Sequence, residues 1–180
     1  MHRDVQGSST TPTHTVTWHE DPMQSVMYTS TQLFFGCNAG SLRVLDVASG
    51  ACIQLQRNQI GDQFLMAMSA LSADGGMLIS ASWDGTLSLW GMLRGGSEWV
   101  CNLTLTGHTQ AVTCVAVCGK WAVSGSEDTT VRVWDLTTGV CQKVMEGHTR
   151  AVLAVALSRD CSTAISGGSD CTVKIWRLYD

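Results

Sequence analysis

Residues 121–136 read Trp-Ala-Val-Ser-Gly-Ser-Glu-Asp-Thr-Thr-Val-Arg-Val-Trp-Asp-Leu, and two other stretches of the chain repeat this pattern. Residues 77–92 read Met-Leu-Ile-Ser-Ala-Ser-Trp-Asp-Gly-Thr-Leu-Ser-Leu-Trp-Gly-Met, and residues 163–178 read Thr-Ala-Ile-Ser-Gly-Gly-Ser-Asp-Cys-Thr-Val-Lys-Ile-Trp-Arg-Leu. Aligned on Trp90, Trp134 and Trp176, each copy has an aspartate six positions earlier and a serine ten positions earlier. The three tryptophans are 44 and 42 residues apart. A nearly fixed period of this length indicates an internal repeat.

A fourth, weaker copy covers residues 33–47, where Leu45-Asp46 stands in place of Trp-Asp. Each copy divides into short apolar runs separated by turn residues, which predicts β-strands joined by hairpins. In the third copy the predicted strands are 111–117, 121–126, 130–136 and 141–146. Valine occurs at both alternating positions of these runs, as in sheets that are covered on both faces. The sequence therefore predicts an all-β chain of about four β-propeller blades, each of four antiparallel strands, forming a partial or small propeller.

Composition narrows the functional class. The 180 residues are 44% hydrophobic but only 14% charged, against roughly 25% in an ordinary soluble domain. The net charge of −4, with 11 basic residues, argues against a nucleic-acid binder, which needs a basic surface. Residues 1–7 contain no apolar run, and no stretch is long enough to span a membrane. We therefore expect an intracellular, cytoplasmic protein, with a nuclear location left open.

The cysteines and the missing catalytic motifs point away from reactive chemistry. Because the chain has no Cys-x-x-Cys pair, we expect its eight cysteines to be small buried thiols rather than a disulfide framework or a zinc site. The sequence also lacks a phosphate-binding loop, a Gly-x-Ser-x-Gly elbow and a His-Glu-x-x-His motif. We accordingly expect no enzymatic activity, no cofactor and no metal.

The Gly107-His108 and Gly147-His148 pairs, together with Trp134-Asp135, make the chain resemble the WD-repeat β-propeller family. In that family a histidine, a strand serine, the turn aspartate and the tryptophan form a hydrogen-bonded set that stabilises the blade. The second copy has Gly61-Asp62 where Gly-His belongs, so its set lacks the histidine, and the first copy has none. By position, the resemblance assigns His108, Ser124, Asp128 and Trp134 to the third copy, His148, Ser166, Asp170 and Trp176 to the fourth, and Ser80, Asp84 and Trp90 to the second.

The ends of the repeat array leave its closure open. We expect a flexible arm at residues 1–12 and a WD-repeat region at 13–180, with blades at about 20–60, 61–106, 107–146 and 147–180. The last blade has only three predicted strands, and the alternating segment 13–18 could supply its fourth, as the two termini do in propellers of this family. The ends could thus close a four-bladed ring. The alternative, which we favour because the family usually has about seven blades, is a piece of a longer propeller or an assembly completed by another chain.

Function is expected on the surface loops. The resemblance implies a non-catalytic protein–protein interaction scaffold of the adaptor, regulatory or substrate-recognition kind, with proteins or peptides as partners and neither membrane nor nucleic acid. The alternative is an incomplete propeller without binding activity of its own, which needs self-association or another propeller segment to complete it. In the family, the link before each first strand and the aspartate turn share one rim. The partner-binding candidates on that rim are Trp83, Gln110, Glu127, Arg150 and Ser169.

Overall fold

The computed structural model describes residues 23–29, 31–37, 42–55, 65–70, 77–92 and 99–179. These residues form fifteen β-strands and no helix, which confirms the all-β prediction. The first eight strands are β1 (Met23–Tyr28), β2 (Gln32–Cys37), β3 (Leu42–Asp46), β4 (Cys52–Leu55), β5 (Leu65–Ala70), β6 (Met77–Ser82), β7 (Leu87–Met92) and β8 (Trp99–Leu105). The others are β9 (Val112–Cys118), β10 (Trp121–Ser126), β11 (Val131–Asp135), β12 (Val140–Met145), β13 (Val152–Leu157), β14 (Thr163–Gly168) and β15 (Val173–Arg177).

The strands pair in sequence order into four antiparallel sheets, which we call blades 1 to 4. Blade 1 contains β1–β4, blade 2 contains β5–β8, blade 3 contains β9–β12, and blade 4 contains β13–β15. In blade 3 the observed strand ends differ by one residue at most from the strands expected from sequence. The predicted arm at 1–12 and the predicted strand at 13–18 lie outside the described residues. In the described part of the chain, blade 4 thus has three strands.

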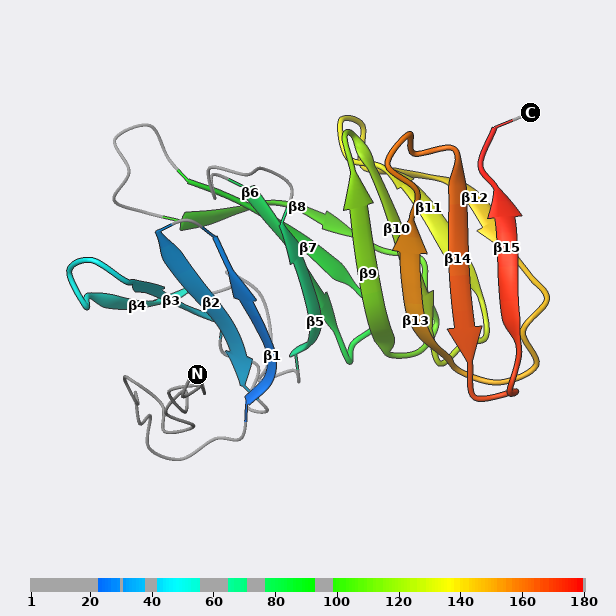
Figure 1. Ribbon diagram of the computed structural model, residues 1–180, viewed down its shortest axis with the longest axis horizontal. Helices are drawn as coiled ribbons and strands as arrows, with labels where there is room; N and C mark the ends of the chain where they lie inside the picture. The colour runs from blue at the N-terminus through cyan, green and yellow to red at the C-terminus, as the bar shows by residue number, and fades with distance from the viewer. Residues whose placement is uncertain are drawn as a thin grey trace, which may run out of the picture.

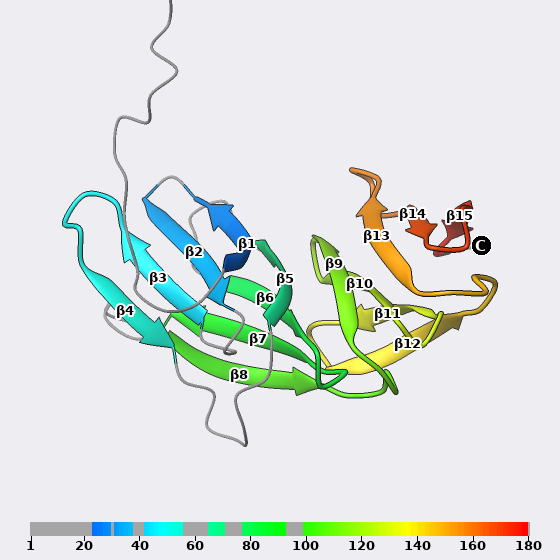
Figure 2. The same cartoon turned by 90° about the horizontal axis from the view of Figure 1, so that it is seen from below.

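The blades follow one another along an open arc. Strand β1 contacts β5, β5 contacts β9, and β9 contacts β13, so the first strands of successive blades lie side by side (Figure 1). Figure 2 shows this row on the inner side of the arc, with blades 1 and 4 at its two ends. The described residues therefore form β-propeller blades in an unclosed arrangement.

Apolar side chains between neighbouring blades form the core. Between blades 2 and 3, Ile79 and Leu89 pack with Val115 and Trp134. Corresponding clusters join blade 1 to blade 2 and blade 3 to blade 4. Since fully burying one large aliphatic side chain contributes roughly 1.5–3 kcal/mol, these clusters are the main force that holds the blades together.

The expectation that the cysteines are small buried thiols is only partly confirmed. Cys114 is buried, as expected, but Cys118 and Cys161 form a disulfide. Cys118 ends the first strand of blade 3, and Cys161 lies in the turn after the first strand of blade 4. The two are 43 residues apart, about one repeat, so stacking of the blades brings equivalent turns together. Cys171 is exposed rather than buried.

Candidate protein-interaction site

A chain of hydrogen bonds runs through blade 3 and converges on Ser124. The indole Nε1 of Trp134 donates to Ser124 Oγ at 2.8 Å, and His108 Nε2 lies 2.7 Å from the same oxygen. His108 Nδ1 lies 2.8 Å from Asp128 Oδ2. With the imidazole proton on Nδ1, Ser124 donates to Nε2 and His108 donates to the carboxylate. The indole, the hydroxyl and both imidazole nitrogens then each have a partner.

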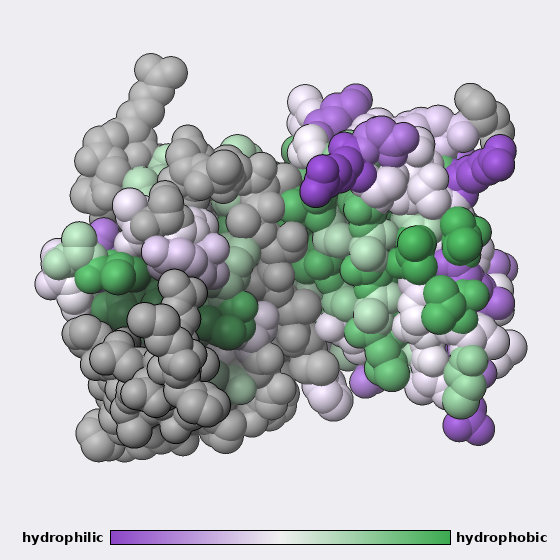
Figure 3. Space-filling model, viewed as in Figure 1, coloured by the Kyte–Doolittle hydropathy of each residue, from purple (hydrophilic) through white to green (hydrophobic). Residues whose placement is uncertain are grey.

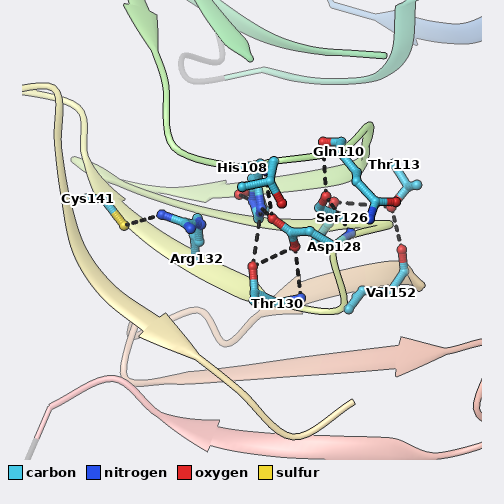
Figure 4. Close-up of polar contacts among 12 residues, drawn as sticks. His108, Gln110, Thr113, Ser126, Asp128, Thr130, Arg132, Cys141 and Val152 are labelled. Atoms are coloured by element: carbon cyan, nitrogen blue, oxygen red, sulfur yellow. Dashed lines mark hydrogen bonds and ion pairs between the residues drawn. The ribbon is translucent and has the colours of Figure 1, made fainter. Parts of the chain in front are cut away.

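Asp128 connects this series of hydrogen bonds to the rim of the blade (Figure 4). Its carboxylate accepts from the Thr109 amide at 3.1 Å, the Thr130 amide at 2.9 Å and the Thr130 hydroxyl at 2.7 Å, in addition to His108. Burial by itself would raise the pKa of Asp128, but these hydrogen bonds outweigh it and hold the pKa at about 2. Asp128 is therefore ionised throughout the physiological pH range.

Blade 4 has the same geometry and blade 2 a shorter version. His148 Nδ1 lies 2.8 Å from Asp170, and His148 Nε2 and Trp176 Nε1 each lie 2.8 Å from Ser166 Oγ. In blade 2, Trp90 Nε1 donates to Ser80 at 2.9 Å. Asp84 accepts from the amide and hydroxyl of Thr86 at 2.9 and 2.5 Å, while Gly61-Asp62 lies outside the described residues.

Sequence reasoning missed the threonines that complete the three turns. Thr86, Thr130 and Thr172 each stand two residues after the turn aspartate and donate to it through both amide and hydroxyl. The residue between them has a positive φ: 82° at Gly85, 72° at Thr129 and 64° at Cys171. The turn bonds offset the cost of a left-handed conformation at the two non-glycine positions. The recurring Asp-x-Thr spacing was the available signal.

The five partner-binding candidates come from turns and links at one rim. The Glu127 amide donates to Ala111 O at 3.0 Å, and the Ser169 amide donates to Ala151 O at 2.9 Å, so each aspartate turn lies beside the link before the first strand. Ser126 Oγ donates to Gln110 O at 3.1 Å (Figure 4).

The same rim continues from blade 2 to blade 3. A Cβ at Gly85 would lie 2.9 Å from His108 O, which places the turn carrying Trp83 against the link that carries Gln110. Trp83 is 50% exposed, Gln110, Arg150 and Ser169 are exposed, and Glu127 is half-buried.

Acid should destabilise the blades through His108. The pKa of His108 lies below its ordinary 6.5, chiefly because burial disfavours the imidazolium, although Asp128 partly opposes this. As the pH falls below 6.5, the unfolded chain binds a proton that the folded chain does not. We expect the Tm to fall between pH 7 and pH 5. For this group, the free energy of unfolding should decrease by at most about 1.4 kcal/mol per pH unit. Thermal melts of the His108→Gln variant should show a weaker pH dependence; an equal dependence would contradict the assignment.

Two absences hold for the part of the chain that the structure describes. None of its segments is a helix with the length and hydrophobicity needed to cross a lipid bilayer. Nor do the described side chains include three His, Cys, Asp or Glu residues grouped so that they could hold a metal ion.

Consecutive antiparallel blades, three of which have an indole bonded to a strand serine, define a repeat-built β-propeller protein. The family described as WD domain, G-beta repeat matches residues 58–91, 99–135 and 139–177, and the chain belongs to this WD-repeat family. The small ribosomal subunit protein RACK1 of Neurospora crassa is 38% identical over 168 residues, covering 69% of this chain and 53% of that protein. Cell division control protein 4 of Candida albicans is 40% identical over 75 residues, 41% of this chain and 11% of that protein.

The fold also matches a solved structure. The crystal structure of the computationally designed Ika4 protein superposes with a TM-score of 0.76 at 26% identity, covering 92% of this chain and 96% of that one. By contrast, the chain spans at most about half the length of the two curated relatives, 53% and 11%. The resemblance to those relatives therefore concerns the repeats, and their whole activities do not transfer with it.

Proposed function

We propose that the chain is a non-catalytic protein–protein interaction scaffold that binds a protein or peptide partner across the rim carrying Trp83 and Arg150. The observation that carries this proposal is the half-exposed indole of Trp83 on a turn fixed against the next blade. Exposed tryptophan and arginine side chains are frequent hot spots of protein interfaces. Membership of the WD-repeat family supports the role, and adaptor, regulatory and substrate-recognition functions all fit it.

The rim is suited to binding because its backbone is held in place. The carboxylates of Asp128 and Asp170 bond the amides of Thr109 and Thr149, so the links before β9 and β13 are tied to the aspartate turns. Arg150 follows Thr149 directly and is exposed. A partner that binds here would lose little free energy in ordering the loops. We infer an intracellular, cytoplasmic setting, since the relatives include a ribosomal subunit protein.

Capture of partner proteins with the Trp83→Ala variant tests the proposal. A hot-spot tryptophan contributes about 2 kcal/mol or more, so we expect the affinity of the folded variant for the main captured partner to fall by roughly thirty-fold. Val140→Ala is the matched control, because Val140 is 51% exposed and lies at the start of β12, at the opposite rim. Equal capture by wild type, Trp83→Ala and Arg150→Glu would overturn the proposal.

A further inference from the structure

The same face of every blade is built to be covered by the next blade, and in blade 4 it is not covered. We call this the leading face. Its apolar residues on the second and third strands are at most 4% exposed in the first three blades, whereas their equivalents in blade 4 are 44% to 72% exposed. The residues are Phe34, Leu42 and Val44 in blade 1, Ile79, Leu87 and Leu89 in blade 2, Val123, Val131 and Val133 in blade 3, and Ile165, Val173 and Ile175 in blade 4.

Figure 3 shows hydrophobic side chains gathered over β13–β15, where this leading face lies. Leu153 on β13 is also exposed there. A contiguous apolar surface of this kind marks an interaction site in a folded protein.

The opposite end of the arc exposes the complementary surface. We call the face that covers a preceding blade the trailing face. In blades 3 and 4 its residues Val112, Val115, Val152 and Leu178 are at most 9% exposed. Pairing register aligns Val112 and Val152 with Met23, and Val115 with Val26. Val47 takes the place of Leu178, because each amide donates to the residue just before the second strand of its blade. Met23, Val26 and Val47 are 48% to 66% exposed. Among the described residues, one chain thus carries both halves of a blade–blade contact, each without its counterpart.

A glycine position shows where the missing blade would fit. A Cβ at Gly125 in blade 3 would lie 2.5 Å from Val152 Cγ1 of blade 4, so the next blade packs directly on this backbone. Gly167 is the equivalent residue of blade 4, and a Cβ there would meet nothing within 4 Å. The repeat alignment places Met23 of an incoming blade 1 over Gly167, just as Val152 lies over Gly125.

We propose that two copies of this chain close one ring, with the leading face of blade 4 in each copy packed on the trailing face of blade 1 in the other. Two arcs of four blades make eight, which is within the range of known propellers. A twofold axis makes both contacts identical, so every open face is covered and growth stops at the dimer. The second copy is the favoured occupant because the chain itself carries the complementary surface.

Analytical ultracentrifugation of the intact chain tests the assembly over a wide concentration range. We expect a species of twice the mass of the chain. Ile175→Asp and Val26→Asp each place an unpaired charge in both contacts, and each should weaken the dimer by at least about a hundredfold. Because both positions are exposed in the single chain, the melts of the two variants at low concentration should match that of the wild type. Val140→Asp is the control and should leave the dimer intact.

Mixing the two variants provides a sharper readout. In a mixed pair, one contact carries both substitutions and the other carries none, so dimers should reappear only in the mixture. Oxidation of a variant with Met23→Cys and Gly167→Cys should give a covalent dimer, and neither single variant should. A monomer at all concentrations, oligomers that keep growing, or a dimer unaffected by Ile175→Asp and Val26→Asp would each overturn the proposal. The first two outcomes would indicate that another propeller segment covers these faces.

Discussion

Replacing Asp128 by alanine is expected to lower the free energy of unfolding by about 3–5 kcal/mol, because it leaves several donors without an acceptor. The carboxylate accepts from His108 Nδ1, the Thr109 amide, and the amide and hydroxyl of Thr130. The His108 side chain is fully buried, so its N–H cannot turn to water instead. The effect should therefore extend from the turn to Ser124, because Asp128 no longer orients the imidazole that bonds the Ser124 hydroxyl.

Asp84→Ala is the matched control for this change. Asp84 occupies the same turn position in blade 2, where its carboxylate accepts from the amide and hydroxyl of Thr86, but it is exposed to solvent. We expect a cost of about 1 kcal/mol there, mainly from the turn. Chemical denaturation of both variants measures the difference. Equal losses would show that the histidine chain adds nothing to the stability of blade 3.

Asp128 also gives a second, independent check at low pH. Since its pKa is lowered to about 2 in the folded protein, its contribution is complete above the ordinary value near 3.8 and is lost as the pH falls toward 2. Asp128→Ala should therefore flatten the fall in stability between pH 4 and pH 2.

Much of the fold could be predicted because the repeat is local. In blade 3 the strand ends agree with the sequence within one residue, since each strand is short and bounded by turn residues. The spacing of Ser124, Asp128 and Trp134 placed three members of the hydrogen-bond chain on one hairpin. Their register follows directly, because Ser124 pairs with Arg132 and Ala122 with Trp134 across β10 and β11.

The features that could not be predicted from the sequence depend on contacts between blades. The Cys118–Cys161 disulfide follows from stacking of neighbouring turns, and no local pattern shows it. The exposure of Ile175 could not be predicted either, because its sequence context matches that of the buried Val133. A repeat tells which face is apolar, but only the arrangement in space tells which copy of that face is uncovered.

Gly125→Ala is expected to destabilise the protein by about 2 kcal/mol, although alanine is ordinarily the better strand residue. The new methyl group would lie 2.5 Å from Val152 Cγ1 and 2.7 Å from Cys114 Sγ, so blades 3 and 4 must separate or distort. Blade 2 already has Ala81 at this position, but it pairs in register with Ala67, where blade 3 pairs Gly125 with the larger Cys114. The double change Gly125→Ala with Cys114→Ala should therefore recover part of the lost stability.

Gly167→Ala is the informative counterpart in blade 4. With nothing within 4 Å of the new Cβ, we expect it to be neutral, or to stabilise the single chain by up to about 1 kcal/mol through the unfolded state. Both glycine variants should be measured in the Ile175→Asp background, where association is suppressed and the melts report the single chain. A loss at Gly167 as large as that at Gly125 would mean that the leading face of blade 4 is covered within the chain itself. If only the Gly125 variant is destabilised, steric contact between blades, and not the backbone preference of the strand, accounts for glycine at this position of blade 3.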